Sequence, residues 1–271
     1  MAYEPRRWPH VVAHRGDSGQ APENTRLAVE RAIDIGVDMV EIDVRLTKDD
    51  VPILIHYAQL EHTTTGKGLV TDHTWEEIQR LDAGVWRGPE FAGERVPSLQ
   101  EVLDLARGQV PLNLDFQTSD VVAPGVAVVR DTGMTGDVVI SGCRVDCFEI
   151  MATATQEITT LLNPDALPAG IDPVEAGMDP AEAAAAVRHG VDAAGALGAA
   201  GINLQHSLVD AALVARAREA GLGVWAWVVD DEERFAELID MGVTAVTTNR
   251  PAPMLAVVGR RSSIAIEETD G

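Results

Sequence analysis

Positive charge is scarce in this chain of 271 residues, and that scarcity excludes two classes of partner. Lys and Arg together number 21 against 43 Asp and Glu, so the net charge is −22. A nucleic-acid binder needs a basic surface, and docking on anionic membranes needs clusters of basic residues. We therefore expect a small-molecule partner and no nucleic acid.

Long apolar runs are absent and cysteine is rare. No run approaches the roughly 20 residues of a membrane-spanning helix, and the first residues lack the apolar core of a secretory signal peptide. Cys143 and Cys147 form one C-x3-C pair with no second pair, which is typical of reduced thiols rather than a zinc site. We expect a cytoplasmic protein without stable membrane insertion; the sequence carries no signal of its oligomeric state.

Strand-like and helix-like segments alternate along the chain, which predicts a (β/α)8 barrel, or TIM barrel. The expected parallel strands begin near residues 10, 39, 111, 138, 158, 202, 224 and 245. A doubly wound open sheet is the alternative, but that fold normally has a glycine-rich phosphate-binding turn after its first strand. This chain has none, and no linker divides residues 1–271 into two domains.

Residues 40–56, VEIDVRLTKDDVPILIH, carry the most informative pattern. Apolar and charged residues alternate in the first half, which predicts a strand with one polar face. The polar break that follows is too short for a parallel crossover, so the chain must return antiparallel as a hairpin arm. A turn in that break places Asp43 opposite residue 55 and brings His56 beside Glu41.

Acidic residues gather where a barrel places its active site, at the carboxyl ends of its strands. Glu41 and Asp43 share one face of the second strand, and Asp115 lies near the end of the third barrel strand. Carboxylate oxygens are the ligands of hard cations, so we expect these three acids to hold Mg²⁺ or Ca²⁺. The alternative is a salt-bridged polar layer inside the barrel that includes Arg15 or Arg45.

Two histidines flank the expected cation. His14 ends the first strand and His56 ends the hairpin arm, and together they fit a general acid and a general base. Arg15 offers a fork of donors for a phosphate or carboxylate. A cation, an arginine and two histidines indicate attack at a phosphorus centre.

Short motifs recur in a fixed order between residues 14 and about 251. They are HRG, PENT, EIDVRLTKDDVPILIH, TTTGKG, VPSLQEVL, VWAWVVDDEE and TTNRP. In this the chain resembles the glycerophosphodiester phosphodiesterase family. The resemblance implies a (β/α)8 barrel with a small insertion, about residues 57–98, after the second barrel strand. It also implies an enzyme of lipid metabolism that splits a glycerophosphodiester into glycerol 3-phosphate and an alcohol.

The resemblance also assigns roles to matching positions. It implies that His14 and His56 are the catalytic pair, that Arg15 contacts the phosphate, that Trp227 lines the pocket, and that Glu41, Asp43 and Asp115 hold the metal. Family enzymes let a substrate hydroxyl attack phosphorus first, which gives a cyclic phosphate that water then opens. Which histidine is the initial base is left open by the sequence.

The chain departs from the family pattern on its third barrel strand. The family reads Glu-x-Lys where this chain has Asp115-Phe116-Gln117, so one positive charge is missing from the expected phosphate pocket. The remaining lysines are Lys48, at the hairpin tip, and Lys67, on the insertion, from which it could reach over the site. We expect Gln117, which shares a face with Asp115, and Lys67 to take part in substrate binding.

Other departures line the same expected pocket and favour an altered substrate. Tyr57 replaces an aspartate, His62 an arginine, Gly142 a phenylalanine and Asn249 an aspartate. The preferred function is metal-dependent hydrolysis of a glycerophosphodiester or related small phosphodiester. The alternatives are another phosphorylated substrate, a lyase that releases the cyclic phosphate, and a non-catalytic ligand-binding barrel. The retained histidines and acids favour an enzyme, whereas the missing lysine favours a binding protein.

Overall fold

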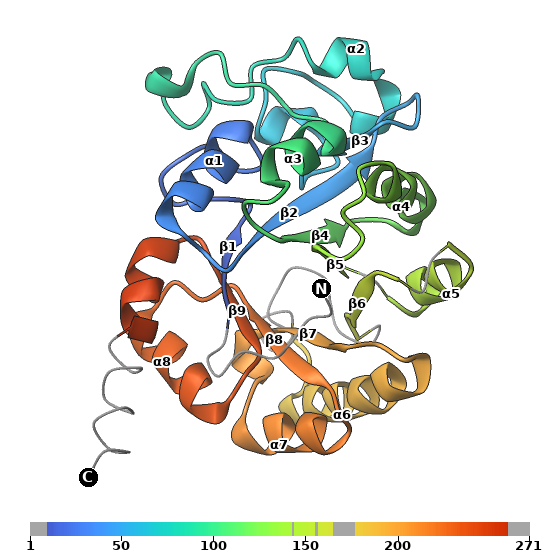
Figure 1. Ribbon diagram of the computed structural model, residues 1–271, viewed down its shortest axis with the longest axis vertical. Helices are drawn as coiled ribbons and strands as arrows, with labels where there is room; N and C mark the ends of the chain where they lie inside the picture. Colours follow the sequence, from blue (N-terminus) through green and yellow to red (C-terminus); the bar gives the residue numbers. More distant parts are fainter. Residues whose placement is uncertain (1–9, 143, 155–156, 165–176, 260–271) are drawn as a thin grey trace.

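The computed structural model describes residues 10–142, 144–154, 157–164 and 177–259. Eight parallel strands form a closed barrel, as predicted, because β1 pairs with both β2 and β9 (Figure 1). The barrel strands are β1 (His10–His14), β2 (Met39–Leu46), β4 (Leu112–Phe116), β5 (Val138–Ser141), β6 (Thr159–Leu162), β7 (Gly201–Gln205), β8 (Gly223–Trp227) and β9 (Ala245–Thr248). The open doubly wound alternative is therefore wrong.

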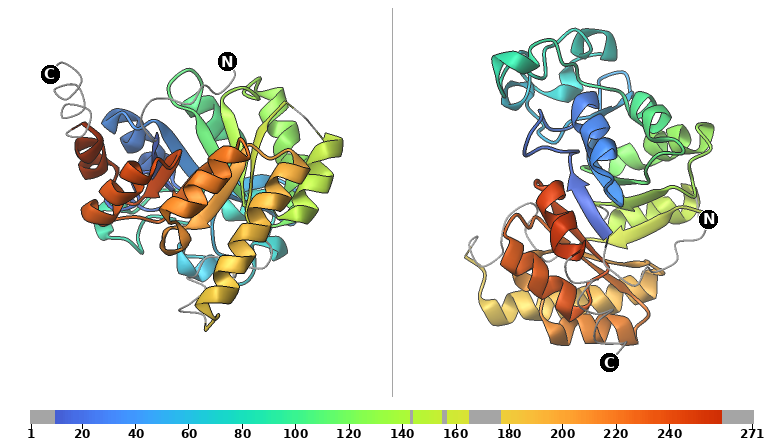
Figure 2. Two further views of the ribbon diagram at one scale, coloured as in Figure 1. Left: turned by 90° about the horizontal axis from the view of Figure 1, so that it is seen from below. Right: turned by 60° about the vertical axis from the view of Figure 1, so that its left-hand side comes forward.

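Helices follow the strands and cover the outside of the barrel (Figures 1 and 2). They are α1 (Arg26–Ile35), α3 (Leu99–Ala106), α4 (Val122–Asp131), α5 (Val145–Ala154), α6 (Pro180–Leu197), α7 (Ala211–Glu219) and α8 (Glu232–Met241). Local signals set their ends. The Thr25 side chain accepts a hydrogen bond from the Ala28 N–H at the start of α1, and Gly36 ends that helix with a left-handed φ of 80°.

One helix differs clearly from its predicted bounds. The sequence pattern predicts a helix from Leu208 to Ala220, but residues 206–208 form a 3-10 turn, η5 (His206–Leu208), and α7 begins at Ala211. The Asp210 carboxylate accepts a hydrogen bond from the Leu213 N–H and so fixes the later start. The polar turn before it lies at the carboxyl end of β7, beside the barrel mouth.

The hairpin arm has the predicted register. β3 (Pro52–Leu54) runs antiparallel to β2, with Val44 opposite Leu54. The Ile55 N–H donates to the Asp43 carbonyl at 3.1 Å, which confirms the predicted pairing of these positions. The next residue, His56, is therefore brought to the mouth of the barrel.

The insertion packs as a small unit beyond the end of the hairpin arm (Figure 1). It contains α2 (Trp75–Ile78) and the 3-10 turns η1 (Leu60–His62), η2 (Val70–Asp72) and η3 (Pro89–Phe91). Its own apolar cluster includes Leu60, Val70 and Ile78, which pack against Ile53 of β3. The insertion thereby anchors the arm that carries His56.

Apolar side chains form two layers. The larger cluster joins the strands to the surrounding helices, and a smaller cluster of Val12, Met39, Val139, Leu161, Trp225 and Ala245 comes from barrel strands alone. Trp225 is 3% exposed and is therefore a core residue. Polar residues follow these positions along the strands, so the functional side chains gather at the carboxyl ends. No helix within the described ranges is long and apolar enough to cross a membrane.

Candidate active site

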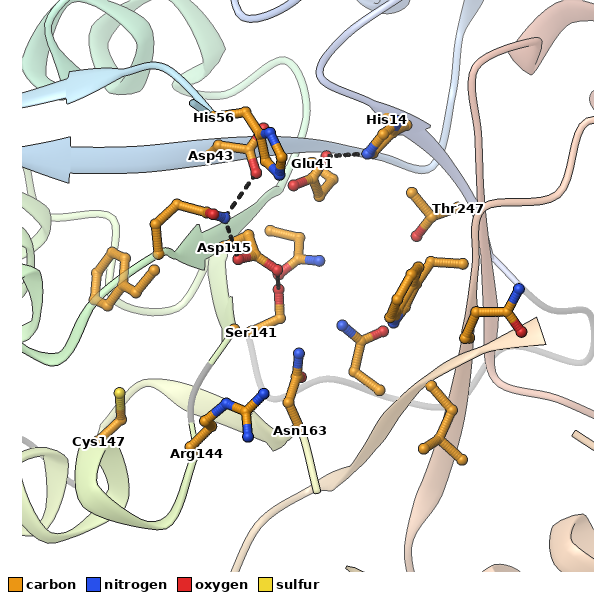
Figure 3. Close-up of a pocket in the computed structure, with 18 of the residues that line it drawn as sticks. His14, Glu41, Asp43, His56, Asp115, Ser141, Arg144, Cys147, Asn163 and Thr247 are labelled. Atoms are coloured by element: carbon orange, nitrogen blue, oxygen red, sulfur yellow. Dashed lines mark hydrogen bonds and ion pairs between the residues drawn. The ribbon is translucent and has the colours of Figure 1, made fainter. Parts of the chain in front are cut away.

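A cavity of about 860 Å³ opens at the carboxyl ends of the barrel strands (Figure 3). Eight of the nine residues predicted for the site line it: His14, Arg15, Glu41, Asp43, His56, Asp115, Gln117 and Trp227. Lys67 does not line the cavity and is exposed on the insertion. Its contact with substrate stays a prediction.

Asp43 is the most heavily contacted carboxylate of the site and is 2% exposed. Arg15 Nε lies 2.8 Å from Asp43 Oδ2, an ion-pair contact without hydrogen-bond alignment. Asn24 Nδ2 donates to the same oxygen at 2.8 Å, and Gln117 Nε2 donates to Oδ1 at 2.8 Å. These contacts hold the Asp43 side chain in one orientation.

Glu41 and Asp115 have less compensating charge. Glu41 Oε2 accepts from the Arg15 backbone N–H at 2.9 Å, and Asp115 Oδ1 accepts from Gln117 Nε2 at 2.7 Å. Burial and the nearby Asp43 carboxylate raise the pKa of both groups, that of Asp115 to about 7. The cluster therefore carries more buried negative charge than its neighbours neutralise.

The alternative reading, a salt-bridged polar layer, is realised only in part. Arg15 contacts Asp43 and also donates to Glu23 Oε1 at 2.7 Å. Arg45, in contrast, donates to the His56 carbonyl at 2.7 Å. Neither arginine makes an ion pair with Asp115, so salt bridges do not account for the whole cluster.

The chemistry of the cluster fits a hard divalent cation, because three oxygen donors with excess negative charge converge on one cavity. In this structure the three carboxylates do not surround a common point at which a cation would be bound. Within the described ranges, no three acidic, histidine or cysteine side chains form a group ready to hold an ion. The Gln117 amide lies between Asp43 and Asp115 and takes one oxygen from each. Cation binding thus stays a prediction.

Neighbouring groups fix the orientation of His14. Its Nδ1 lies 2.7 Å from Asn249 Oδ1, while Asn249 Nδ2 donates to Asp230 Oδ2 at 2.6 Å. Because Asp230 accepts from the amide nitrogen, the amide oxygen must face His14, and an oxygen can only accept. The proton of a neutral His14 therefore sits on Nδ1, and Nε2 is left as a proton acceptor beside Glu41, 3.9 Å away.

Burial, followed by the positive charge of Arg15, lowers the pKa of His14 to about 4. The ring is thus neutral near pH 7. The sequence did not reveal this arrangement, because no local pattern links Asp230 to Asn249 or to His14. The feature of the sequence that could have indicated the His14–Asn249 contact is the TTNRP motif, in which Asn249 replaces the aspartate of the family.

His56 lies against an aromatic wall. Its ring meets Tyr57 edge-on with centroids 4.7 Å apart, and Tyr57 stacks on His62 at 4.3 Å. Burial lowers the pKa of His56, whereas the Asp43 carboxylate favours its charged form. Two departures from the family pattern, Tyr57 and His62, therefore support the second histidine instead of carrying a charge to the phosphate.

Gly142 is required by the loop in which it lies. Its φ is 72°, and a Cβ atom there would lie 2.4 Å from Asp115 Oδ1. A side chain would both strain the backbone and displace the carboxylate. The phenylalanine of the family pattern cannot be restored without moving this loop.

The raised pKa of Asp115 predicts how the cation-free protein responds to pH. The folded state holds a proton at Asp115 that the unfolded chain releases above about pH 4, so this group loses stability as pH rises toward 7. Asp115→Asn should therefore raise the melting temperature in chelator more at pH 7.5 than at pH 5. A difference of about 2 kcal/mol between the two pH values corresponds to roughly 4–8 °C for a chain of this size. An equal shift at both pH values would contradict the prediction.

The fold and the family match together define an enzyme class, and the chain is a phosphoric diester hydrolase. The glycerophosphoryl diester phosphodiesterase family model matches residues 14–253. The chain belongs to this family, which confirms the resemblance seen in its motifs.

Relatives agree in sequence and in fold. The chain is 32% identical to the Bacillus subtilis protein YhdW over 244 residues, which is 89% of this chain and 95% of that protein. A solved phosphodiesterase of Oleispira antarctica, in complex with the product sn-glycerol-3-phosphate, is 28% identical with a TM-score of 0.80 and covers 93% of this chain and 97% of its own. A glycerophosphodiester phosphodiesterase of Agrobacterium tumefaciens is 26% identical with a TM-score of 0.74, covering 92% and 99%.

Proposed function

We propose that this enzyme hydrolyses a glycerophosphodiester to glycerol 3-phosphate and an alcohol, with His14 and His56 as the acid–base pair. The observation that carries the proposal is the convergence of these histidines, from separate segments of the chain, on one cavity with three carboxylates (Figure 3). Arg15 lines the same cavity. Membership of the family and the likeness to a structure with sn-glycerol-3-phosphate bound support the choice of substrate.

His14 is the initial base in this scheme. Its Nδ1 proton is directed to Asn249, so Nε2 takes the proton of the attacking substrate hydroxyl. The oxygen of that hydroxyl bonds to phosphorus and the bond to the leaving alcohol breaks. His56 enters this step in its protonated form and gives its proton to the alcohol oxygen. Water then opens the cyclic phosphate with the two roles reversed.

Glu41, Asp43 and Asp115 would hold the divalent cation, Mg²⁺ or Ca²⁺. When bound, the cation offsets the negative charge that develops on the phosphoryl oxygens. Arg15 contributes to the same task, although its guanidinium is already shared between Asp43 and Glu23. The activity would place the protein in lipid metabolism, and a cytoplasmic location stays a prediction.

A panel of glycerophosphodiesters with cation-stripped and cation-restored protein tests the proposal, with products identified by phosphorus NMR. The expected product is a phosphomonoester, formed only with cation. Accumulation of a cyclic phosphate would show a lyase instead. Ligand-induced thermal stabilisation without any product would show a binding protein and overturn the proposal.

We expect a cation to compete with the Gln117 amide, because the amide hydrogen-bonds two of the expected cation ligands, Asp43 and Asp115. Hydrogen bonds to charged groups are worth about 1.5–3 kcal/mol each. Gln117→Leu should therefore lower the melting temperature in chelator by several degrees and enlarge the rise caused by added Mg²⁺ or Ca²⁺. The same change at Gln100, an exposed residue of α3, is the control and should alter neither value. A smaller cation response in Gln117→Leu would instead make Gln117 a ligand.

A further inference from the structure

The cavity extends well beyond the cluster of acids and histidines. Arg144, just before α5, and Asn163, just after β6, lie across the cavity from His14 and Asp43 (Figure 3). A volume of about 860 Å³ is near the upper end of the range of roughly 300–1,000 Å³ for small-molecule sites. The cavity therefore has room for a substituent of the phosphate in addition to glycerol.

Besides Arg15 Nε and His56 Nδ1, three buried polar atoms of the lining have no hydrogen-bond partner within the described part of the chain: Asn113 Oδ1, Asn163 Oδ1 and Trp227 Nε1. Leaving a buried polar group unpaired is costly, so a partner from the cavity would stabilise each of these atoms. The amide oxygens need donors, and the indole N–H needs an acceptor. Hydroxyl groups supply both, and they would still do so if either amide were turned over.

The charge on this side of the cavity also favours a hydroxylated group. The lining contains two arginines, Arg15 beside Asp43 and Arg144 on the opposite side of the cavity. Asp146 also lines the cavity, but its side chain is exposed. A quaternary ammonium group would face the Arg144 guanidinium, and it has no N–H to offer the amide oxygens.

We propose that Arg144, Asn163 and Trp227 form a subsite for the leaving alcohol, and that it selects a polyhydroxylated alcohol, such as glycerol or a cyclitol, over a quaternary ammonium alcohol. This inference rests on the proposed phosphodiesterase function. It also accounts for the departures from the family pattern: the positive charge lost at Gln117 has a counterpart at Arg144, displaced from phosphorus toward the leaving group.

The kcat/KM values for glycerophosphoinositol and glycerophosphocholine test the subsite. We expect the wild type to favour the inositol diester by about tenfold or more, since one or two hydrogen bonds of about 1 kcal/mol each are at stake. Arg144→Met and Asn163→Leu should each reduce that ratio by about tenfold. Arg130→Met, at an exposed position of α4, is the control and should leave the ratio unchanged.

Binding separates failure of the subsite from failure of the proposed function. In the His14→Ala variant, calorimetric Kd values for the same two diesters report the subsite without turnover. The subsite is supported if the inositol diester binds more tightly than the choline diester and if this preference is lost when Arg144→Met is added. This holds even if neither diester is hydrolysed. Equal binding of the two diesters, a preference for the choline diester, or a ratio unaffected by both variants would overturn it.

Discussion

Replacing His14 or His56 by alanine is expected to lower kcat about 100- to 10,000-fold, the usual effect of losing a positioned proton donor or acceptor. Each ring has one role in the scheme: His14 presents Nε2 as the proton acceptor, and His56 lines the same cavity as the proton donor. The double variant should cost little more than the worse single variant, because residues that act as a unit are not additive.

The matched control is His73→Ala, since His73 lies on the insertion and hydrogen-bonds the Lys67 carbonyl outside the cavity. Its kcat should stay within about twofold of wild type, as for a surface change that touches no reacting group. Melting curves of all variants check that the barrel is intact. A single variant at position 14 or 56 that keeps a near-normal rate and a normal melting curve would remove that histidine from the mechanism.

Much of the site could be predicted because local rules fix it. The short polar break after β2 permits only a hairpin, and the period of two then decides that residues 43 and 55 pair. The residues at the strand ends could also be predicted to lie together, because parallel strands place their carboxyl ends at one edge of a barrel. Glu41 and Asp115 were therefore located from the sequence alone.

The partners of these residues could not be predicted, because they depend on loops distant in sequence. Asn249 reaches His14 across 235 positions, and only the packing of β9 against β1 brings them together. Gln117 was placed on the correct face of its strand, but the face does not reveal that its amide binds Asp43 rather than a substrate. Arg144 lies in a loop without a motif, so nothing in the sequence drew attention to it.

The largest effect on ligand binding is expected from the acidic cluster. If Glu41, Asp43 and Asp115 hold the cation, Mg²⁺ or Ca²⁺ at about 100 times its Kd should stabilise the fold by about 2.7 kcal/mol. For a domain of this size that is a rise in melting temperature of roughly 5–11 °C. Glu41→Gln combined with Asp43→Asn keeps the side-chain shapes and removes two charges, so the rise should disappear together with the hydrolytic activity.

Removal of charge alone must be distinguished from loss of the site. Asp34→Asn combined with Glu219→Gln removes the same two charges from exposed surface positions and should keep both the rise and the activity. The single variant Glu41→Gln has a second expected signature: in chelator it should melt no lower than wild type, because burial and repulsion from Asp43 and Asp115 already disfavour the charged form of Glu41. The wild-type protein could instead be fully active in chelator and have the same melting curve with and without either cation. That result would show that the three acids serve the reaction without a metal.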